Sequence, residues 1–534
     1  MVMDSRSRRR VRFALWVAGF ALLFALYTAG LKRNPPGFYL DEAGAAYNGY
    51  LISRTGAGEF GPRFPLYLQY YANSFIQLGC PTQPYMLAVL FRFFPPSIFL
   101  ARMFSAFWVF CACLLLGLLA RRISGRRLVG FIVGATAMVT PWLFEGRGLL
   151  LEPQFIPMAL APFLLMLYHV HKKESWNWVE VAGLVASLDL ITYCYTSGRV
   201  LGPLLALGLL VFATSWPRLR SVITTGFLYG VSLVPILVFN WRHPGALTKR
   251  LTEISYIRPG VPLGDVLSQF VKRYLEDQSL MGLLVNGDYH PRHHVPGSGG
   301  AFFFATFVLV LIGLAVVLSR RWRDPWWRFV LYGLAVAIVP GAMSVEPFHG
   351  MRLMAYPVFL LLMTIPALEW LLARPAPSAG PETLPDLAGT EVVPENTPLL
   401  EPAMSEGGPP RWVRVAILCV LLAVTGVEAY RFQVVFRRDG PNRVFDFDVN
   451  YKAVYDAAVK LPSRPIYLED GMWGPAYIHA LWYATVEKRP TSQFVHLAEG
   501  AKPPSGAVVI SSANGCQNCT TILRSGVYQL YKTL

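Results

Sequence analysis

Two adjacent carboxylates, Asp41 and Glu42, follow the first apolar segment of the chain and have the residue type and position for proton chemistry. Acidic side chains beside a membrane-spanning segment are costly unless they have a function or a partner. In one interpretation, Asp41 accepts a proton from a reacting hydroxyl group. In the other, the pair has only a structural role, because carboxylates in the first turn stabilise a helix through its dipole. Spacing alone leaves both interpretations open.

A second charged group, Glu145, Arg147 and Glu152, lies in a short turn between two later apolar segments. So short a turn must keep these side chains at one membrane surface, the same surface as Asp41. Arg147 could pair with either carboxylate as a tether between helices. Alternatively, two separated carboxylates and a cation suit group transfer, in which a base takes a proton while cations hold a phosphate leaving group.

Further cations occur in two other turns on the same predicted side. Arg199 follows Tyr195 in the turn after the fifth apolar segment. His349 and Arg352 are three residues apart, so they would share one face of a helix beginning there. These residues extend the set that could hold a phosphate.

The segment NGDYHPRHHVPGSGG concentrates histidines beside an acid and a cation: Asp288, His290, Arg292, His293 and His294. Histidine and carboxylate together permit a divalent metal site. The HxxHH spacing is not specific for metal ligation, however, so solvent or phosphate contacts are the alternative.

Apolar residues make up 54% of the 534-residue chain and charged residues only 15%. Soluble proteins contain about 25% charged residues, so this chain cannot cover its own surface and is predicted to be an integral membrane protein. Its net charge of +16 would suit nucleic acid, but the basic residues lie between apolar segments, as membrane topology requires. Nucleic-acid binding is therefore excluded as a primary function.

The apolar runs predict about eleven membrane-spanning helices. A basic cluster precedes the first run, which is long for a signal peptide and lacks a small-x-small cleavage site, so it is expected to stay uncleaved. The shorter apolar stretch 84–97 is interpreted as interfacial or re-entrant. The predicted spans are 13–31, 98–120, 128–144, 153–170, 178–196, 199–215, 221–240, 301–319, 329–345, 353–373 and 412–430.

Alternate connections are short and basic, which predicts their side of the membrane. These connections and the N-terminus are expected in the cytoplasm of a multi-pass protein of the plasma or inner membrane. The long loops 32–97 and 241–300 and the C-terminal segment 431–534 then face outward. The basic connections contain Arg121, Arg122, Arg126, Arg127, Lys172, Lys173, Arg218, Arg220, Arg320, Arg321, Arg323 and Arg328.

Two segments near the C-terminus differ from the bundle. Residues 374–411 are rich in proline and acidic residues, which predicts a disordered cytoplasmic linker. Residues 431–534 mix β-like runs at 465–468, 507–510 and 527–531 with a helical stretch at 450–461. This mixture predicts a small extracytoplasmic α/β domain. Within it, Cys516 and Cys519 are expected to form a local disulfide or to remain free thiols.

Five motifs follow one another along the chain on the predicted outer face: DEAGAAYNGYLISRTGAGEFGPRFPLY, RMFSAF, EGRGLLLEPQF, GDYHPRHHVPG and EPFHGMR. As a set they resemble the membrane glycosyltransferases that use polyprenyl-phosphate sugars, namely the protein O-mannosyltransferases and the lipid A aminoarabinose transferases. The resemblance covers most of residues 10–430. It implies the GT-C fold: an all-α polytopic catalytic module, here 1–373, with its active site at the outer membrane surface.

The resemblance also implies roles for single residues. Asp41 is the implied general base, with Glu42 beside it and Glu152 at a second acidic position. Glu59 stands where the aminoarabinose transferases have an acidic residue in the first loop, although their Glu-Lys-Pro pattern is absent. The expected substrate-binding set is Glu59, Arg147, Tyr195, Arg199, Arg292, His293, His349 and Arg352, and the candidate metal ligands are Glu59, His290 and His293.

The leading hypothesis is an inverting glycosyltransferase that moves a hexosyl or pentosyl group from polyprenyl phosphate to an extracytoplasmic lipid, glycan or protein. No Walker or GxGxxG loop occurs, as expected for a donor that is not a nucleotide sugar. A divalent metal ion is the one cofactor that the pattern permits, and membrane lipids are expected partners. The alternatives are a transporter or flippase of lipid-linked sugars, and a polysaccharide polymerase or ligase. Transporters place ionisable residues within spans, whereas here Asp189 is nearly the only acidic residue in one.

Overall fold

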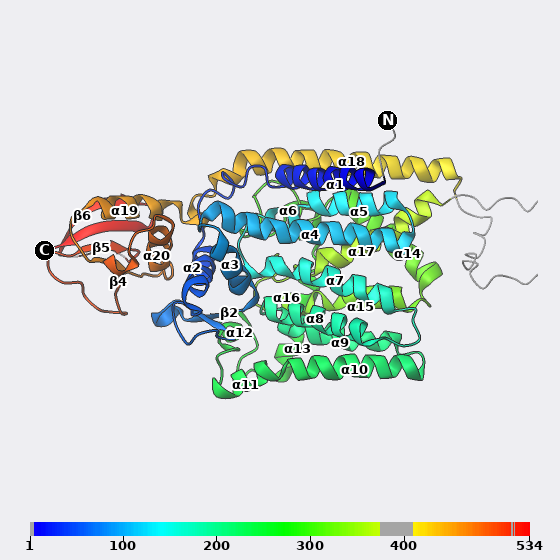
Figure 1. Cartoon of the computed structure of the whole chain (residues 1–534), viewed down its shortest axis with the longest axis horizontal. Helices are drawn as coiled ribbons and strands as arrows, with labels where there is room; N and C mark the ends of the chain where they lie inside the picture. The colour runs from blue at the N-terminus through cyan, green and yellow to red at the C-terminus, as the bar shows by residue number, and fades with distance from the viewer. Residues whose placement is uncertain (1–4, 374–408, 514–515, 517) are drawn as a thin grey trace, which may run out of the picture.

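The computed structural model of the chain describes residues 5–373, 409–513, 516 and 518–534. A bundle of roughly parallel and antiparallel helices forms its larger part, and a small α/β domain at the C-terminus caps one end of this bundle (Figure 1). The predicted linker at 374–411 lies almost entirely outside the described residues. The all-α polytopic fold with a small C-terminal α/β domain is confirmed.

Helices overlap every segment that the sequence predicts to span a membrane. Capping residues define several ends: Ser97 accepts a hydrogen bond from the Leu100 amide (3.1 Å) where one long helix begins, and Gly125 ends it with φ of 67°. The bundle helices are α1 (Ser5–Tyr27), α4 (Ile98–Ser124), α5 (Arg127–Val139), α7 (Phe155–Val170), α8 (Trp178–Cys194), α9 (Gly198–Gly208), α10 (Trp216–Ser232), α11 (Val234–Arg242), α14 (Phe304–Val316), α15 (Pro325–Val336), α17 (Tyr356–Leu372) and α18 (Arg411–Asp439).

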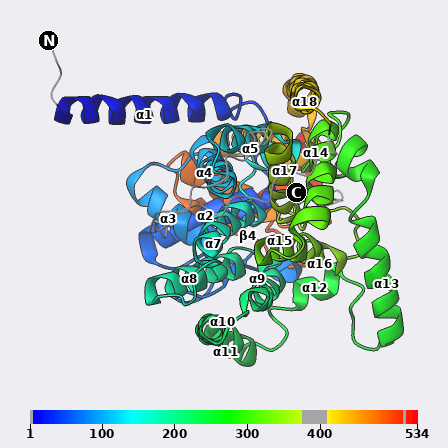
Figure 2. The ribbon, with the colours of Figure 1, turned by 90° about the vertical axis from the view of Figure 1, so that its right-hand side faces the viewer.

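Five helical stretches of the described chain are long and apolar enough to cross a membrane alone: Ile98–Ser124, Glu152–Val170, Trp216–Arg242, Phe304–Arg321 and Arg411–Asn442. Shorter apolar helices, among them α5 and α17, pack between them, and the chain is therefore a multi-pass membrane protein. Helix α1 projects away from the bundle at its N-terminal end (Figure 2).

The basic connections 121–127, 172–173, 218–220 and 320–328 lie at one end of the bundle, which we call the basic end. The C-terminal domain lies at the opposite end, the domain end, where α4 begins and α18 finishes (Figure 1). The loops that carry the predicted site residues are also at the domain end. The charge separation that the sequence predicted is therefore a property of the fold.

Short elements from the long loops, together with α6 and α16 from two shorter connections, cover the domain end. They include the predicted interfacial stretch, which forms helix α3 and ends at Phe93 just before Pro95 and Pro96. Helix α13 lies across the direction of the bundle (Figure 2). These elements are α2 (Leu40–Thr55), β1 (Leu68–Tyr70), β2 (Gln77–Gly79), α3 (Thr82–Phe93), α6 (Pro141–Gly146), α12 (Lys249–Ile254), α13 (Leu263–Glu276) and α16 (Val339–Ala342).

The C-terminal domain has a five-stranded mixed sheet in the order β4-β3-β5-β7-β6, with β3 parallel to β4 and β5. Strands β3, β5 and β7 and helix α19 overlap the predicted runs, whereas α20, β4 and β6 were not expected. Cys516 and Cys519 are free thiols. The elements are α19 (Val449–Lys460), β3 (Ile466–Glu469), α20 (Tyr477–Val486), β4 (Phe494–His496), β5 (Val508–Ser511), β6 (Cys519–Ser525) and β7 (Tyr528–Thr533).

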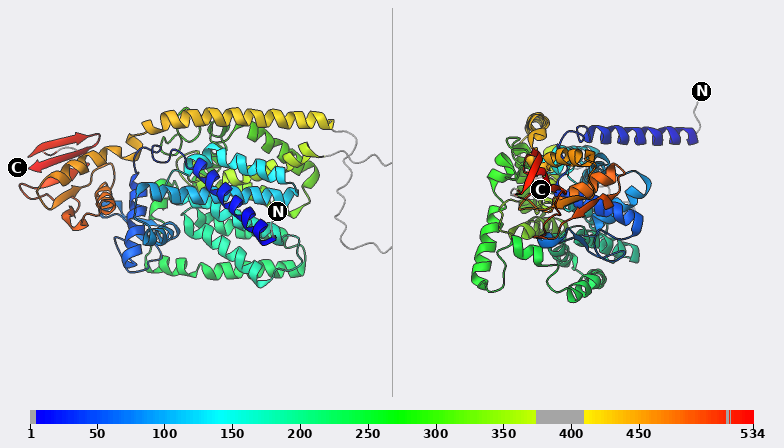
Figure 3. Two further views of the ribbon diagram at one scale, coloured as in Figure 1. Left: turned by 45° about the horizontal axis from the view of Figure 1, so that its top comes forward. Right: turned by 90° about the vertical axis from the view of Figure 1, so that its left-hand side faces the viewer.

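One hydrophobic core joins this domain to the first long loop. Phe38, immediately before α2, stacks on Trp482 of α20 with ring centroids 5.5 Å apart, and both side chains are fully buried. Figure 3 shows the domain seated against α2 and α3 in both views. Because burial of large aromatic rings dominates packing energy, the domain fixes the position of α2.

Candidate active site

Helix α2 begins with the two predicted carboxylates, and their surroundings differ. Glu42 is fully buried and accepts four hydrogen bonds, from the amides of Tyr39 (2.9 Å) and Leu150 (3.0 Å) and from two nitrogens of Arg102 (2.8 and 3.1 Å). Arg102 also donates to two backbone carbonyls. With both oxygens occupied by protein donors, Glu42 positions the start of α2.

Asp41 is half-buried and lies beside a tyrosine from the second part of the loop. The Tyr71 hydroxyl donates to Asp41 Oδ1 at 2.9 Å. Gly44, one helical turn on, permits this contact, because a Cβ there would lie 2.8 Å from the Tyr71 hydroxyl. Tyr71 therefore fixes the orientation of the Asp41 carboxylate.

Glu152 lies in a short 3-10 helix, Glu152–Gln154, before α7. Its Oε1 accepts a hydrogen bond from the Cys80 amide at 2.7 Å. The guanidinium of Arg199 lies next to this contact, 3.6 Å from Cys80 Sγ and 4.6 Å from the centre of the Tyr67 ring. Three separate loops thus bring an acid and a cation together.

Asp41 and Glu152 act on a common neighbour, Tyr70 of β1. Burial raises the pKa of the Tyr70 hydroxyl well above its ordinary value, and the negative charges of Glu152 and Asp41 raise it further. The two predicted acids are therefore on the same side of the molecule and within electrostatic reach of one phenol. Sequence spacing alone could not establish this proximity.

Tyr195 connects the Glu152 side of the site to the last predicted cation. Burial raises the pKa of Tyr195 to about 12, Arg352 opposes that rise and Glu152 reinforces it. Arg352 forms an ion pair with Glu346 at 2.7 Å. Tyr195 is thus within electrostatic reach of both Glu152 and Arg352, and Arg199 is within electrostatic reach of Glu152.

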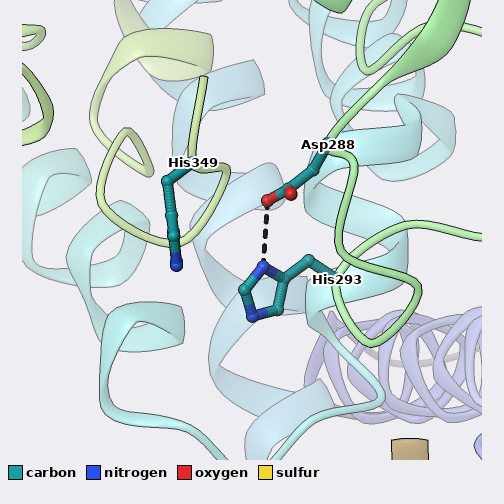
Figure 4. Close-up of side chains that lie close together, drawn as sticks. All are labelled: Asp288, His293 and His349. Atoms are coloured by element: carbon teal, nitrogen blue, oxygen red, sulfur yellow. Dashed lines mark hydrogen bonds and ion pairs between the residues drawn. The ribbon is translucent and has the colours of Figure 1, made fainter. Parts of the chain in front are cut away.

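The histidines of the second long loop meet the turn before α17. Asp288 Oδ2 lies 2.9 Å from His293 Nδ1, and His349 lies beside this pair (Figure 4). Although burial raises the pKa of Asp288, the hydrogen bond from His293 and the nearby imidazoles lower it to about 2. His290 and Glu346 extend the cluster, at 3.6 Å from each other.

This histidine cluster has the donor atoms for a metal ion. One ligand atom each from Asp288, His293 and His349 lie within 4.8 Å of one another, and so do those of His290, Glu346 and His349. Burial and neighbouring cationic groups hold the pKa of His349 well below its ordinary value, so its imidazole is neutral and able to ligate. Nitrogen and oxygen donors in this number suit zinc.

Glu59, the third predicted metal ligand, lies elsewhere. Burial raises its pKa to about 7, and its neighbours are Tyr477, His496 and Asp470 of the C-terminal domain. Among the described residues, Glu59 is not in either of the two groups whose ligand atoms lie within 4.8 Å of one another. Glu59 instead belongs to the contact between the first loop and the C-terminal domain.

Arg147 is also placed away from the predicted phosphate site. It is buried, donates to the carbonyls of Tyr27 (2.9 Å) and Phe144 (3.1 Å), and lies 3.5 Å from the centre of the Phe144 ring. Burial lowers its pKa to about 10. Arg147 is a structural residue that links α1 to α6, and its expected partner Glu145 instead bonds His294 at 2.6 Å.

Arg292 lies on the other side of α2, facing the C-terminal domain. Its guanidinium is 3.4 Å from the centre of the Tyr39 ring, and its Nε donates to the carbonyl of Asp446 at 3.3 Å. Asp448, in the same segment, accepts from the Leu40 amide at 3.2 Å and from the Tyr528 hydroxyl at 2.5 Å. The C-terminal domain therefore contributes side chains next to Asp41.

Several contributing residues were not identified from the sequence. Tyr71 and Cys80 lie in a loop of ambiguous pattern, and Asp448 in a domain to which no role was assigned. Asp288 and Glu346 were noticed within motifs but not selected. The RMFSAF motif was the one signal that pointed to Arg102, the partner of Glu42.

Sequence comparison leaves the chain without a match: no protein-family model and no curated protein matches it. Solved structures do match. The apo structure of ArnT from Cupriavidus metallidurans covers 98% of this chain and 98% of its own, with a TM-score of 0.58 and 12% identity. ArnT from the same organism bound to undecaprenyl phosphate covers 97% of both chains, with a TM-score of 0.51 and 14% identity.

An oligosaccharyltransferase from Archaeoglobus fulgidus, tethered with an acceptor peptide, is a weaker match. It covers 90% of this chain and 64% of its own, with a TM-score of 0.46 and 12% identity. Nearly complete coverage in both directions makes ArnT the informative neighbour. The chain therefore has the fold of ArnT, which is the GT-C fold that the resemblance implied.

Proposed function

We propose that this chain is an inverting glycosyltransferase that moves a sugar from a polyprenyl-phosphate donor to an acceptor hydroxyl group outside the cytoplasm. The observation that carries the proposal is the half-buried Asp41 at the start of α2, oriented by Tyr71 and placed within electrostatic reach of the Glu152 side of the site. The fold supports it, because ArnT has been solved with undecaprenyl phosphate bound.

In the proposed reaction, the acceptor oxygen attacks the anomeric carbon of the donor sugar. The bond from that carbon to the phosphate oxygen breaks, the polyprenyl phosphate departs with the electron pair, and the acceptor proton passes to Asp41. The leaving phosphate is a stable anion and needs no proton. The main proton transfer is therefore the removal of the acceptor hydroxyl proton by a base. Such a base typically contributes about 10²–10⁴-fold.

Arg199 and Arg352 are the proposed phosphate ligands. Arg199 Nε and Arg352 Nη1 are buried and have no hydrogen-bond partner among the described residues. Buried donors without partners are costly, and an anionic oxygen would satisfy them with charge-assisted hydrogen bonds. Tyr195, which is within electrostatic reach of Arg352 and Glu152, would orient the sugar phosphate.

We also propose a divalent metal ion at Asp288, His293 and His349. The fit rests on the close approach of their ligand atoms and on the buried His349 Nδ1, which has no partner in the described part of the chain. When bound, such an ion would supply positive charge close to Arg352. Purified wild-type protein should therefore retain zinc by elemental analysis, the His349→Ala variant should lose it, and a variant at the exposed His169 should not. Equal zinc content in wild type and His349→Ala would contradict the site.

For orientation, we propose that the basic end lies in the cytoplasm of the cell membrane and that the domain end faces outward. The positive-inside rule applied to the four basic connections supports this arrangement. It places the acceptor, whether lipid, glycan or protein, outside the cytoplasm.

The experiment that tests the function uses membranes containing the full chain and a radiolabelled polyprenyl-phosphate sugar. Asp41→Asn keeps an oxygen that can accept from Tyr71, so the variant should fold and insert normally. We expect it to lose about 10²–10⁴-fold in transfer rate. The control Asp456→Asn changes an exposed carboxylate of α19 that pairs with Lys452, and it should transfer normally. Near wild-type transfer by Asp41→Asn would remove Asp41 from the mechanism.

A further inference from the structure

A pocket lies between the start of α2, the second long loop and the C-terminal domain. Tyr39 and Leu40 form one wall, Arg292 lies at its side, and Asp446, Asn450 and Trp473 are among its residues from the C-terminal segment. None of these residues belongs to the proposed donor-phosphate site. The pocket is therefore separate from the donor-phosphate residues, and its wall includes the two residues that precede the proposed catalytic base.

The outer part of this pocket is aromatic. Trp473 and Phe445 are 51% and 61% exposed, although both belong to a domain with a well-formed core. Their ring centroids are 5.7 Å apart and their planes are nearly perpendicular, at 89°. Exposed aromatic rings beside polar groups suit an amphipathic ligand, and the C–H face of a sugar ring can stack on an indole.

The inner part is polar, and acids outnumber cations. Arg292 is flat against Tyr39 and its Nε is occupied by the Asp446 carbonyl. Two carboxylates, Asp446 and Asp448, line the same cavity. Asp448 already accepts from the Leu40 amide and the Tyr528 hydroxyl and lies 3.4 Å from His479 Nε2, so Asp446 is the carboxylate proposed to meet a ligand. The carboxylates would repel a phosphate or carboxylate ligand and weaken its binding. The hydroxyl groups of a neutral ligand can instead donate to the carboxylates and accept from the guanidinium. The charge pattern thus favours a neutral polyhydroxyl ligand.

The pocket is directly connected to the catalytic residue through Tyr39. The Tyr39 ring is the surface on which Arg292 stacks, while burial and then the Asp41 carboxylate raise the pKa of its hydroxyl. Tyr39, Leu40 and Asp41 are also consecutive in the chain. A ligand seated in the pocket would therefore contact the two residues that immediately precede the proposed base in the chain.

We propose that this pocket binds a neutral saccharide, which forms the part of the acceptor presented to Asp41. The inference rests on the proposed glycosyltransferase function for the acceptor role, but binding itself can be tested separately. Trp473 would stack on the sugar, and Asp446 and Arg292 would bind its hydroxyl groups. This assigns the C-terminal domain a role in acceptor recognition.

Binding is tested with the full chain in lipid nanodiscs by saturation-transfer NMR. The probes are maltotetraose, chitotetraose and α-1,6-mannotetraose, with trigalacturonate as the anionic counterpart. We expect at least one neutral probe to bind, to lose affinity tenfold or more in Trp473→Ala and Asp446→Asn, and to keep it in Trp322→Ala, a tryptophan of similar exposure (55%) near the basic end. Absence of binding by all three neutral probes, tighter binding of trigalacturonate, or unchanged binding in Trp473→Ala would each overturn the proposal.

Transfer assays in native membranes separate this proposal from the function on which it rests. Trp473→Ala should raise the acceptor concentration needed for half-maximal transfer tenfold or more and leave the donor KM unchanged. If Asp41→Asn abolishes transfer while Trp473→Ala behaves as wild type, the function stands and the acceptor pocket is wrong. If Asp41→Asn transfers normally, the catalytic account fails and the acceptor role of the pocket fails with it, whatever the sugar-binding result.

Discussion

Asp41 and Glu42 are adjacent in the chain, but their surroundings give them separate tasks. Asp41 receives a single side-chain hydrogen bond, from Tyr71, and stays half-exposed. Glu42 is enclosed by Arg102 and backbone amides. Substitutions at the two positions should therefore affect different properties.

Glu42→Gln is expected to destabilise the protein. Removing one partner of a buried ion pair leaves the other charge uncompensated, which costs about 3–5 kcal/mol. The melting temperature of the purified variant should fall sharply. Glu253→Gln, which breaks the exposed pair with Arg250, should cost no more than about 1 kcal/mol. Equal stability of Glu42→Gln and wild type would refute the buried pair as a determinant of α2.

Buried Arg147 and partly buried Arg199 should respond differently to replacement by lysine. Arg147→Lys loses the contact with Phe144 and one carbonyl, so it should lower the melting temperature while the donor KM of the surviving protein stays unchanged. Arg199→Lys should raise the donor KM about tenfold with little loss of stability, because a single ammonium group cannot replace a forked donor. Kinetics and thermal unfolding of both variants check this assignment. A raised donor KM in Arg147→Lys would return that residue to the phosphate site.

At the scale of elements, the contact between the first loop and the C-terminal domain should depend on pH through Glu59. Its folded pKa of about 7 exceeds the unfolded value of about 4.3, so the folded state holds more protons between these values. Stability should therefore be full below about pH 4 and decrease as pH rises toward 7, by an amount on the order of 2 kcal/mol.

Glu59→Gln tests this dependence, because glutamine stays neutral. Melting temperatures measured from pH 5 to 8 should fall for wild type and change less for Glu59→Gln, which should be the more stable of the two at pH 8. The exposed Glu174 provides a control glutamine variant. Parallel curves for wild type and Glu59→Gln would show that Glu59 is not buried as described.

The elements themselves were largely predictable because membrane-spanning helices leave a strong sequence signal. Apolar length and alternating basic connections identified a helix for every predicted span. Strands β4 and β6 were not predictable: β4 has only three residues, and β6 exposes much of its seven-residue length. Their pairing with β3 and β7 depends on tertiary contacts rather than on local pattern.

The site was predictable in its residue types but less so in its groupings. Asp41 and Glu152 were selected because acidic residues beside a membrane span are costly, Arg199 as a cation for a phosphate, and the histidines as metal or phosphate contacts. The sequence could not show that Arg147 turns into the core or that Glu59 faces the C-terminal domain, because both outcomes depend on long-range packing.

For the whole molecule, the aromatic core between α2 and the C-terminal domain is the main structural link. Trp482→Ala should cost about 3–5 kcal/mol, the usual effect of removing a buried large side chain, and should also impair transfer by loosening α2. Limited proteolysis should release the C-terminal domain from this variant faster than from wild type or Trp322→Ala. Unchanged proteolysis would mean that the domain is held by other contacts.

The proposed sugar transfer is tested most directly by following the bond between the sugar and the polyprenyl phosphate. Native membranes containing the wild-type chain or Asp41→Asn are given a polyprenyl phosphate that carries a radiolabelled sugar, and the free polyprenyl phosphate and the labelled acceptor are quantified together. Wild type should release the lipid phosphate and label the acceptor in equal amounts, with inverted anomeric configuration, and Asp41→Asn should do neither. Label that crosses the membrane still attached to the lipid, or equal transfer by both proteins, would contradict the account.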